Sequence, residues 1–310
     1  MNPNPKICLL VPCYNEGITI RKVVDDFRRE LPEADIYVYD NNSTDNTVAE
    51  AEAAGAQVRR EPLQGKGNVV RSMFRDIEAD IYVMVDGDDT YPASSVRELI
   101  APVLRGEADM VIGDRLSNGS YYQENSRSFH GLGNNLVRNA VNRFFKVQLH
   151  DIMTGYRVFS RRFVRAFPVL SSGFQLETEM TLFALRYRLR IVEIPIDFTG
   201  RPEGSFSKLN TFSDGVKVIL CILNMYRHYK PLAFFSLLAL LVLAAAMAIG
   251  APVVWEYIEF RYVYKVPSAV LASGLGIAAM LLFVCGILLD TLSHNERSRV
   301  EQILKIIDRI

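Results

Sequence analysis

This 310-residue chain has four cysteines, one tryptophan and no formal net charge. Four cysteines without a CxxC pair exclude a disulfide scaffold and give no zinc motif. Basic and acidic residues both number 35, and this balance argues against a nucleic-acid-binding protein as a class. The opening MNPNPKICLLVP lacks the long apolar core of a signal peptide, so we expect the first domain to stay in the cytosol.

Long apolar runs, in contrast, are present near the end of the chain. Residues 232–254 and 266–289 carry no charge and show no polar face, and each is long enough to cross about 30 Å of hydrocarbon as a helix. Trp255 lies in the aromatic segment between them, and basic residues flank the pair. These runs predict a two-helix hairpin in the cytoplasmic membrane, with the N-terminal domain and the C-terminus in the cytosol.

The first 115 residues alternate between short apolar runs and amphipathic segments. This alternation predicts an α/β fold with a mostly parallel sheet. The expected strands are 6–12, 35–40, 57–61, 80–86 and 109–113, and the expected helices are 19–31, 44–55, 67–77 and 94–106. Ligands of such sheets bind beyond the carboxyl ends of the strands. Polar segments follow those ends at 12–16, 40–45, 86–89 and 113–115.

The segment VMVDGDDTYP places three carboxylates directly after a buried strand. Asp86 and Asp88 repel one another unless they share a cation, and oxygen ligands suit Mg²⁺ or Mn²⁺. The sequence therefore predicts a metal site at this turn, with an ordinary acidic turn as the alternative. Asp89 is either a neighbour of that site or solvated, and we favour the solvated position.

Asp40 and Lys66 follow two other strands. Asp40 can accept a hydrogen bond from a nucleobase or ribose, and Glu16 occupies a similar place. The alternative for Asp40 and Ser43 is capping of the next helix. Lys66, in LQGKGNVV at a helix start, forms a plausible anion site, although the P-loop spacing is missing and a simple turn is the alternative.

Four segments describe the predicted organisation. Residues 211–229 form an apolar-faced helix, which lies on the membrane surface or in a core. The tail places an apolar stripe on one helix face, for an oligomer contact or a membrane surface, and we expect a homo-oligomer. The predicted parts are a catalytic domain (1–210), a juxtamembrane amphipathic helix (211–230), a transmembrane hairpin (231–290) and an amphipathic tail (291–310).

Seven motifs occur in an order that resembles the family 2 glycosyltransferases of the GT-A (Rossmann-like) fold. They are VPCYNE, DNNSTD, GKGNVV, DGDDT, IGDR, MTGYRVF and FQLETEM. The chain is most similar to the polyprenyl-phosphate glycosyltransferases, including dolichol-phosphate mannose synthases and bacterial glucosyltransferases. The resemblance covers roughly residues 6–210 and implies a nucleotide-sugar donor, a polyprenyl phosphate acceptor and Mg²⁺ or Mn²⁺.

The resemblance also implies roles for individual residues. Pro12, Tyr14, Glu16 and Asp40 would line the nucleotide, while Asp86 and Asp88 would hold the metal and the sugar diphosphate. Some relatives have a glutamine where this chain has Thr90, which puts a third protein ligand in doubt.

Basic residues complete the site that the resemblance implies. Arg115 would face the phosphates, and RPEGSFSK would place Arg201 and Lys208 against donor and acceptor phosphates, with a solvated linker as the alternative. Arg127 and Arg157 are weaker phosphate candidates. Two acids in FQLETEM could orient a sugar hydroxyl or a basic neighbour, namely Glu177 and Glu179.

The expected reaction needs no strong base, because a phosphate monoester is largely ionised near neutral pH and is already a nucleophile. Asp151 is a conceivable base without support, and His130 and His150 are interpreted as structural. Competing hypotheses are a processive polysaccharide synthase, a transferase for a glycan or protein acceptor, and an inactive membrane scaffold. The only tryptophan, Trp255, lies in the hairpin, so the QxxRW motif of processive synthases is missing.

Overall fold

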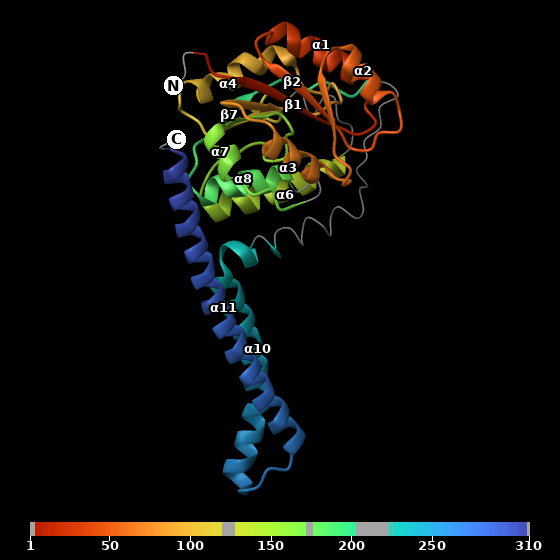
Figure 1. Cartoon of the computed structure of the whole chain (residues 1–310). Coiled ribbons are helices and arrows are strands. Elements are labelled where there is room, and N and C mark those ends of the chain that lie inside the picture. The colour runs from red at the N-terminus through yellow and green to blue at the C-terminus, as the bar shows by residue number, and fades with distance from the viewer. Residues whose placement is uncertain (1–3, 120–127, 172–175, 203–222, 225, 309–310) are drawn as a thin grey trace. The chain divides into compact units, whose positions relative to one another are not determined.

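The computed structural model describes residues 4–119, 128–171, 176–202, 223–224 and 226–308 (Figure 1). The chain divides into two compact units, Met1–Gly215 with Ile303–Ile310 and Val216–Gln302. The first unit contains the predicted sheet, and the second contains one long apolar helix and most of another.

A seven-stranded sheet with the order β3-β2-β1-β4-β6-β5-β7 runs through the first unit. Neighbouring strands are parallel except at β6, which pairs antiparallel with both β4 and β5. The predicted α/β fold with a mostly parallel sheet is confirmed. The strands are β1 (Ile7–Cys13), β2 (Asp35–Asp40), β3 (Gln57–Arg60), β4 (Ile81–Met84), β5 (Met110–Asp114), β6 (Arg157–Ser160) and β7 (Ile191–Pro195).

Helices cover both faces of this sheet (Figure 1). One face carries α1 (Ile20–Glu30), α2 (Thr47–Ala53), the 3₁₀ turn η1 (Ala93–Ser95) and α4 (Val96–Leu104). The other face carries α3 (Lys66–Asp76), α6 (Ser128–Phe145), α7 (Arg161–Ala166) and α8 (Leu176–Arg186). The four helices expected from periodicity are present, each within a few residues of its predicted ends.

The core forms because apolar periodicity matches the elements. In β1, Leu9, Leu10 and Val11 are fully buried because strands on both sides and helices on both faces enclose them. In α1 the apolar face is buried against the sheet, namely Ile20, Val23, Val24 and Phe27. Burial of such side chains contributes about 1.5–3 kcal/mol each.

Strand β6 was not predicted from the sequence. It comes from a chain segment far from β4 and pairs Arg157 with Met84 and Ser160 with Ile81. Because β6 runs antiparallel to β4, the residues that precede Arg157 lie beyond the carboxyl end of β4. The loop before β6 therefore meets the acidic turn that follows β4.

The second unit contains α10 (Pro231–Phe260), and α11 (Val266–Ile307) begins there and continues into the first unit. Their most apolar windows have mean hydropathies of 2.7 and 2.4, and only 11% of each window is buried. By length and composition both helices can cross a membrane. The predicted tail is the last part of α11 as far as the structure describes it. Most of the predicted helix 211–229 lies outside the described residues, while 223–224 and 226–229 are helical.

Candidate active site

The loops after β1 and β2 are joined to each other by hydrogen bonds. The amide of Asn15 donates to Ser43 Oγ at 2.8 Å, and the amide of Gly17 donates to Asp45 Oδ2 at 2.9 Å. Such links hold the Tyr14 to Glu16 segment beside the end of β2. The four residues predicted to line a nucleotide, Pro12, Tyr14, Glu16 and Asp40, are thus brought to one end of the sheet.

Asp40 is buried at the end of β2, where its Oδ1 accepts the amide of Ser43 at 3.2 Å. The N-cap residue of α2 is Asn46, which makes no capping bond with its side chain. Asp45 accepts the amide of Thr47 instead. Asp45 therefore satisfies an amide at the helix start, while Asp40 orders the turn before it.

Asp86 lies beyond β4 and forms an ion pair with Lys66, the first residue of α3. Lys66 Nζ is 2.5 Å from Asp86 Oδ1 and 2.6 Å from Glu177 Oε1 of α8. Burial lowers the pKa of Lys66, but the two carboxylates outweigh burial and raise it, so the ammonium stays charged. The helix-start lysine predicted as an anion site therefore bridges two acids in this structure, and Glu177 orients a basic neighbour.

Asp88 faces a second cation. Its Oδ2 is 2.6 Å from Arg201 Nη2, and its Oδ1 accepts the Thr90 hydroxyl at 2.6 Å. Burial and the negative charge of Asp86 raise the pKa of Asp88, while Arg201 opposes this effect. Arg201, from the segment after β7, thus reaches the acidic turn, and its role at the phosphates stays a prediction.

Asp89 contacts a different cation from those that Asp86 and Asp88 contact. Its backbone is left-handed, with φ of 59°, and its carboxylate is 2.9 Å from Lys22 Nζ of α1. The expected solvated position is only partly right, because Asp89 has a partner, although that lysine is itself 62% exposed.

Gly155 packs directly against the Asp86 carboxylate. A Cβ added to Gly155 would collide with the Asp86 carboxylate, so only glycine leaves room for that side chain. The Gly155 amide donates to the Tyr91 hydroxyl at 2.9 Å, which fixes the loop before β6. Burial raises the pKa of Tyr91 to about 12, so its hydroxyl keeps its proton.

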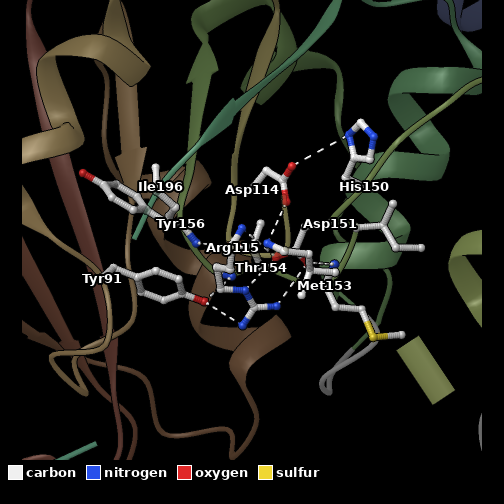
Figure 2. Close-up of polar contacts among 12 residues, drawn as sticks. Tyr91, Asp114, Arg115, His150, Asp151, Met153, Thr154, Tyr156 and Ile196 are labelled. Carbon is white, nitrogen blue, oxygen red and sulfur yellow. Dashed lines mark hydrogen bonds and ion pairs between the residues drawn. The ribbon is translucent and has the colours of Figure 1, made fainter. Parts of the chain in front are cut away.

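Arg115, directly after β5, is held by Asp151 (Figure 2). Its Nε and Nη2 lie 2.7 and 3.1 Å from the two Asp151 oxygens. The guanidinium also lies over the rings of Tyr91 and Phe198, with 5.9 and 5.7 Å to the ring centroids. Because Asp151 is fully buried and both its oxygens hold Arg115, its geometry fits a positioning partner rather than a base.

Arg157 is not a phosphate candidate, because it is fully buried inside the fold. Its guanidinium donates to the carbonyls of Thr154 and Ile152 at 3.0 and 2.7 Å and to the Thr181 hydroxyl at 2.9 Å. Burial lowers the pKa of Arg157 to about 10. The prediction for this residue was wrong, since the TGYR motif contributes a structural arginine.

The remaining predicted residues fall in two groups. Lys208, Arg127 and the side chain of His130 lie outside the described residues. Glu179 accepts the amides of Leu170 and Ser171, both at 3.1 Å, and so orders the loop before α8.

The carboxylate pair fits a hard divalent cation. Asp86 and Asp88 offer oxygen donors, which Mg²⁺ and Mn²⁺ prefer. Each acid contacts a cationic side chain through one carboxylate oxygen. The missing Cβ of Gly155 makes room for the Asp86 carboxylate, and this donor set can accept a metal ion that displaces the two cations.

Sequence reasoning did not single out Tyr91 and Gly155. Tyr91 lies in the quoted DGDDTY segment and Gly155 in TGYR, but a single sequence gives no sign that the two meet. Their meeting depends on the antiparallel strand β6, which the sequence did not predict.

Comparison with known proteins gives the following relationships. Residues 8–167 match the family described as Glycosyl transferase family 2, which is more than half of the chain. The glycosyltransferase AglJ of Haloferax volcanii is 30% identical over 97% of this chain and 99% of its own length. The undecaprenyl-phosphate mannosyltransferase of Micrococcus luteus is 27% identical over 64% of this chain and 86% of its length.

A solved structure shares the fold. Glucosyl-3-phosphoglycerate synthase from Mycobacterium tuberculosis, in complex with Mn²⁺, UDP-glucose and glycerol 3-phosphate, superimposes with a TM-score of 0.58 and 20% identity. The match covers 72% of this chain and 79% of that one.

Proposed function

Because the chain belongs to glycosyl transferase family 2, we propose that it is a membrane-anchored, inverting enzyme that transfers a hexose from a UDP- or GDP-sugar to polyprenyl phosphate. One observation carries this proposal. The carboxylate pair Asp86 and Asp88, at the end of β4, belongs to the same chain as two helices apolar enough to cross a membrane.

The donor would bind at the carboxyl ends of β1, β2 and β4, where open α/β sheets bind ligands. Asp40 and the segment from Pro12 to Glu16 would contact the nucleoside, and Asp86 and Asp88 would hold Mg²⁺ or Mn²⁺ with the diphosphate. The bound metal would neutralise negative charge that develops on the leaving diphosphate.

Metal entry would free the two cations that now pair with the acids. Lys66 and Arg201 lie within 2.6 Å of the carboxylates that the metal would take, so both are within reach of the donor phosphates. Lys208 would act with Arg201 on the acceptor phosphate, and Arg115 would be presented to a phosphate by Asp151. Fixed cations stabilise developing charge without reorganisation at the moment of reaction.

The chemical step needs one displacement. A phosphate oxygen of the lipid attacks the anomeric carbon from the face opposite the leaving group. The new C–O bond forms as the bond between that carbon and the diphosphate oxygen breaks, and the electron pair leaves with the nucleoside diphosphate. The acceptor is already ionised near neutral pH, so no side chain has to remove a proton.

The acceptor assignment is supported by relatives and by composition. The Micrococcus luteus relative is named for transfer to undecaprenyl phosphate, and the helices α10 and α11 would anchor the enzyme in the bilayer that holds such lipids. A glycan or protein acceptor, or an inactive scaffold, is the alternative.

The experiment that tests this proposal uses the full chain in detergent with polyprenyl phosphate, labelled UDP- and GDP-sugars, and Mg²⁺ or Mn²⁺. We expect label to enter the organic phase with one donor and a chelator to stop the transfer. Asp88→Ala should lower the rate by at least about a hundredfold.

Leu104→Ala, at an exposed position on α4, is the control for the substitution itself and should keep the rate. Metal-dependent nucleotide binding without transfer to the lipid would show that the acceptor is different. If the unaltered chain neither binds the nucleotide nor transfers label to the lipid, the inactive-scaffold hypothesis would be supported.

A further inference from the structure

A second group of possible metal ligands lies on the far side of Arg115 from Tyr91. It consists of Asp114, His150 and Glu193, whose donor atoms all lie within 4.8 Å of one another. They come from the end of β5, the loop before β6 and the middle of β7. The pairing of Ile112 with Glu193 puts Asp114 and Glu193 on the same sheet face, since side chains two residues apart project to one side.

The two distances from His150 to the carboxylates are close to those around a tetrahedral ion. His150 Nδ1 is 3.2 Å from Glu193 Oε2 and 3.8 Å from Asp114 Oδ2. A tetrahedral ion with ligand bonds of about 2.1 Å holds its donor atoms about 3.4 Å apart. Figure 2 shows the Asp114 carboxylate directed toward the His150 ring.

Backbone groups fix both carboxylates in place. Glu193 accepts the amides of His150 and Asp151 at 2.9 and 3.0 Å, and Asp114 accepts the amide of Leu116 at 2.8 Å. The Ser117 amide and hydroxyl also donate to Asp114. Ligating carboxylates in metal sites are commonly oriented by such outer contacts. Asp114 Oδ2 and Glu193 Oε2, the oxygens nearest His150 Nδ1, each retain a lone pair for an ion.

Among the described residues, the His150 imidazole is the one potential cationic partner of the two carboxylates. Within the described residues, no lysine or arginine forms an ion pair with Asp114 or Glu193, and neighbouring Arg115 is engaged by Asp151. Both carboxylates are largely shielded, with side chains 2% and 11% exposed. Burial and the charge of Asp114 raise the pKa of Glu193, although its amide contacts oppose this.

We infer that Asp114, His150 and Glu193 bind a structural Zn²⁺-class ion, separate from the metal held by Asp86 and Asp88. One imidazole with two carboxylates is a donor set for borderline metals rather than for Mg²⁺. His150 is 60% exposed, which leaves a solvent route and room for water as the fourth ligand. The ion would join β5, β7 and the loop that carries Asp151, and would thereby position Arg115.

The test measures Zn²⁺ binding by equilibrium dialysis with the full chain in detergent. Asp88→Asn is the background, and excess Mg²⁺ is present, so that the other carboxylate pair does not contribute. We expect about one Zn²⁺ per chain and a rise in Tm on Zn²⁺ addition. His150→Gln and Glu193→Gln should each weaken binding at least about tenfold and remove the Tm rise.

His294→Gln, an exposed histidine of α11, is the matched control and should bind Zn²⁺ like the background. His150 is exposed, so its replacement leaves the core intact. Unchanged Zn²⁺ binding in His150→Gln would overturn the inference. The inference would also be overturned if the background chain bound less than about one Zn²⁺. In that case the imidazole contacts the two carboxylates without an ion between them.

Discussion

At the scale of single residues, the space beside Asp86 is set by one missing side chain. In Gly155→Ala the new Cβ would meet the Asp86 carboxylate and push it from its place. Because a displacement of about 1 Å can cost about a hundredfold in rate, we expect a loss of that order with weaker Mn²⁺ binding. Initial rates and a Mn²⁺ titration of the full chain measure both effects.

Gly274→Ala in α11 is the control, since a Cβ there meets nothing within 4 Å. If Gly155→Ala binds Mn²⁺ and reacts like the unaltered chain, Gly155 does not shape the metal site.

Glu177 shares Lys66 with Asp86, and its removal should be felt at the metal. In Glu177→Gln the ammonium would pair with Asp86 alone and compete more strongly with an incoming cation. We expect Mn²⁺ affinity to fall about tenfold, in line with the loss of one charged hydrogen bond. Glu179→Gln, two residues along the same helix, should leave Mn²⁺ affinity unchanged, and equal effects in both variants would contradict this account.

Single residues also show how far sequence reasoning reached. It singled out Asp86, Asp88, Arg201 and Lys66, because carboxylates and cations at strand ends and loops are visible in a pattern. It assigned Arg157 wrongly, because a sequence does not show that an arginine is fully buried. The partner of a charge is a property of the folded chain, and a single sequence does not contain it.

At the scale of elements, β1 carries two thiols that the fold should protect. Burial raises the pKa of Cys8 to about 11 and that of Cys13 well above its ordinary value. At pH 8 both remain protonated in the folded chain, so we expect iodoacetamide to modify them only after denaturation. The same shift makes folding less favourable as the pH rises from about 9 toward 11.

Peptide mass spectrometry after labelling at pH 8 measures this protection thiol by thiol. Rapid modification of Cys8 and Cys13 in the native chain would mean that β1 opens readily.

The loop before β6 depends on the buried guanidinium of Arg157. Arg157→Met keeps the volume but leaves the carbonyls of Ile152 and Thr154 unpaired, so we expect a loss of about 2 kcal/mol in the free energy of unfolding. Arg157→Lys should be worse, because it keeps a buried charge with fewer hydrogen bonds. Thermal melts rank the variants, and a lysine variant more stable than the methionine variant would contradict the argument.

Strand β6 also explains which part of the architecture escaped sequence analysis. Buried strands such as β1 and β4 follow from apolar runs, and helix α1 follows from its apolar face. RVFS begins with arginine and ends with serine, so it lacks the apolar run of a buried central strand. Only pairing with β4 and β5, distant in sequence, makes it one.

At the scale of the whole molecule, the two apolar helices make topology testable. If both cross the membrane, the segment 261–265 between them faces away from the side that holds the two termini. We expect alkaline phosphatase inserted in this segment to be active and the same reporter at the C-terminus to be inactive. Activity at the C-terminus alone would contradict the predicted orientation.

The position of β6 also has a consequence for the order of events during synthesis. β4 can pair with β6 only after residues 157–160 have been synthesised, more than seventy residues after Met84. At about 5–20 residues per second, this interval lasts roughly 4–15 s. During that time one edge of the nascent sheet has no permanent partner, so the growing chain has a defined window in which chaperones or self-association would act on it.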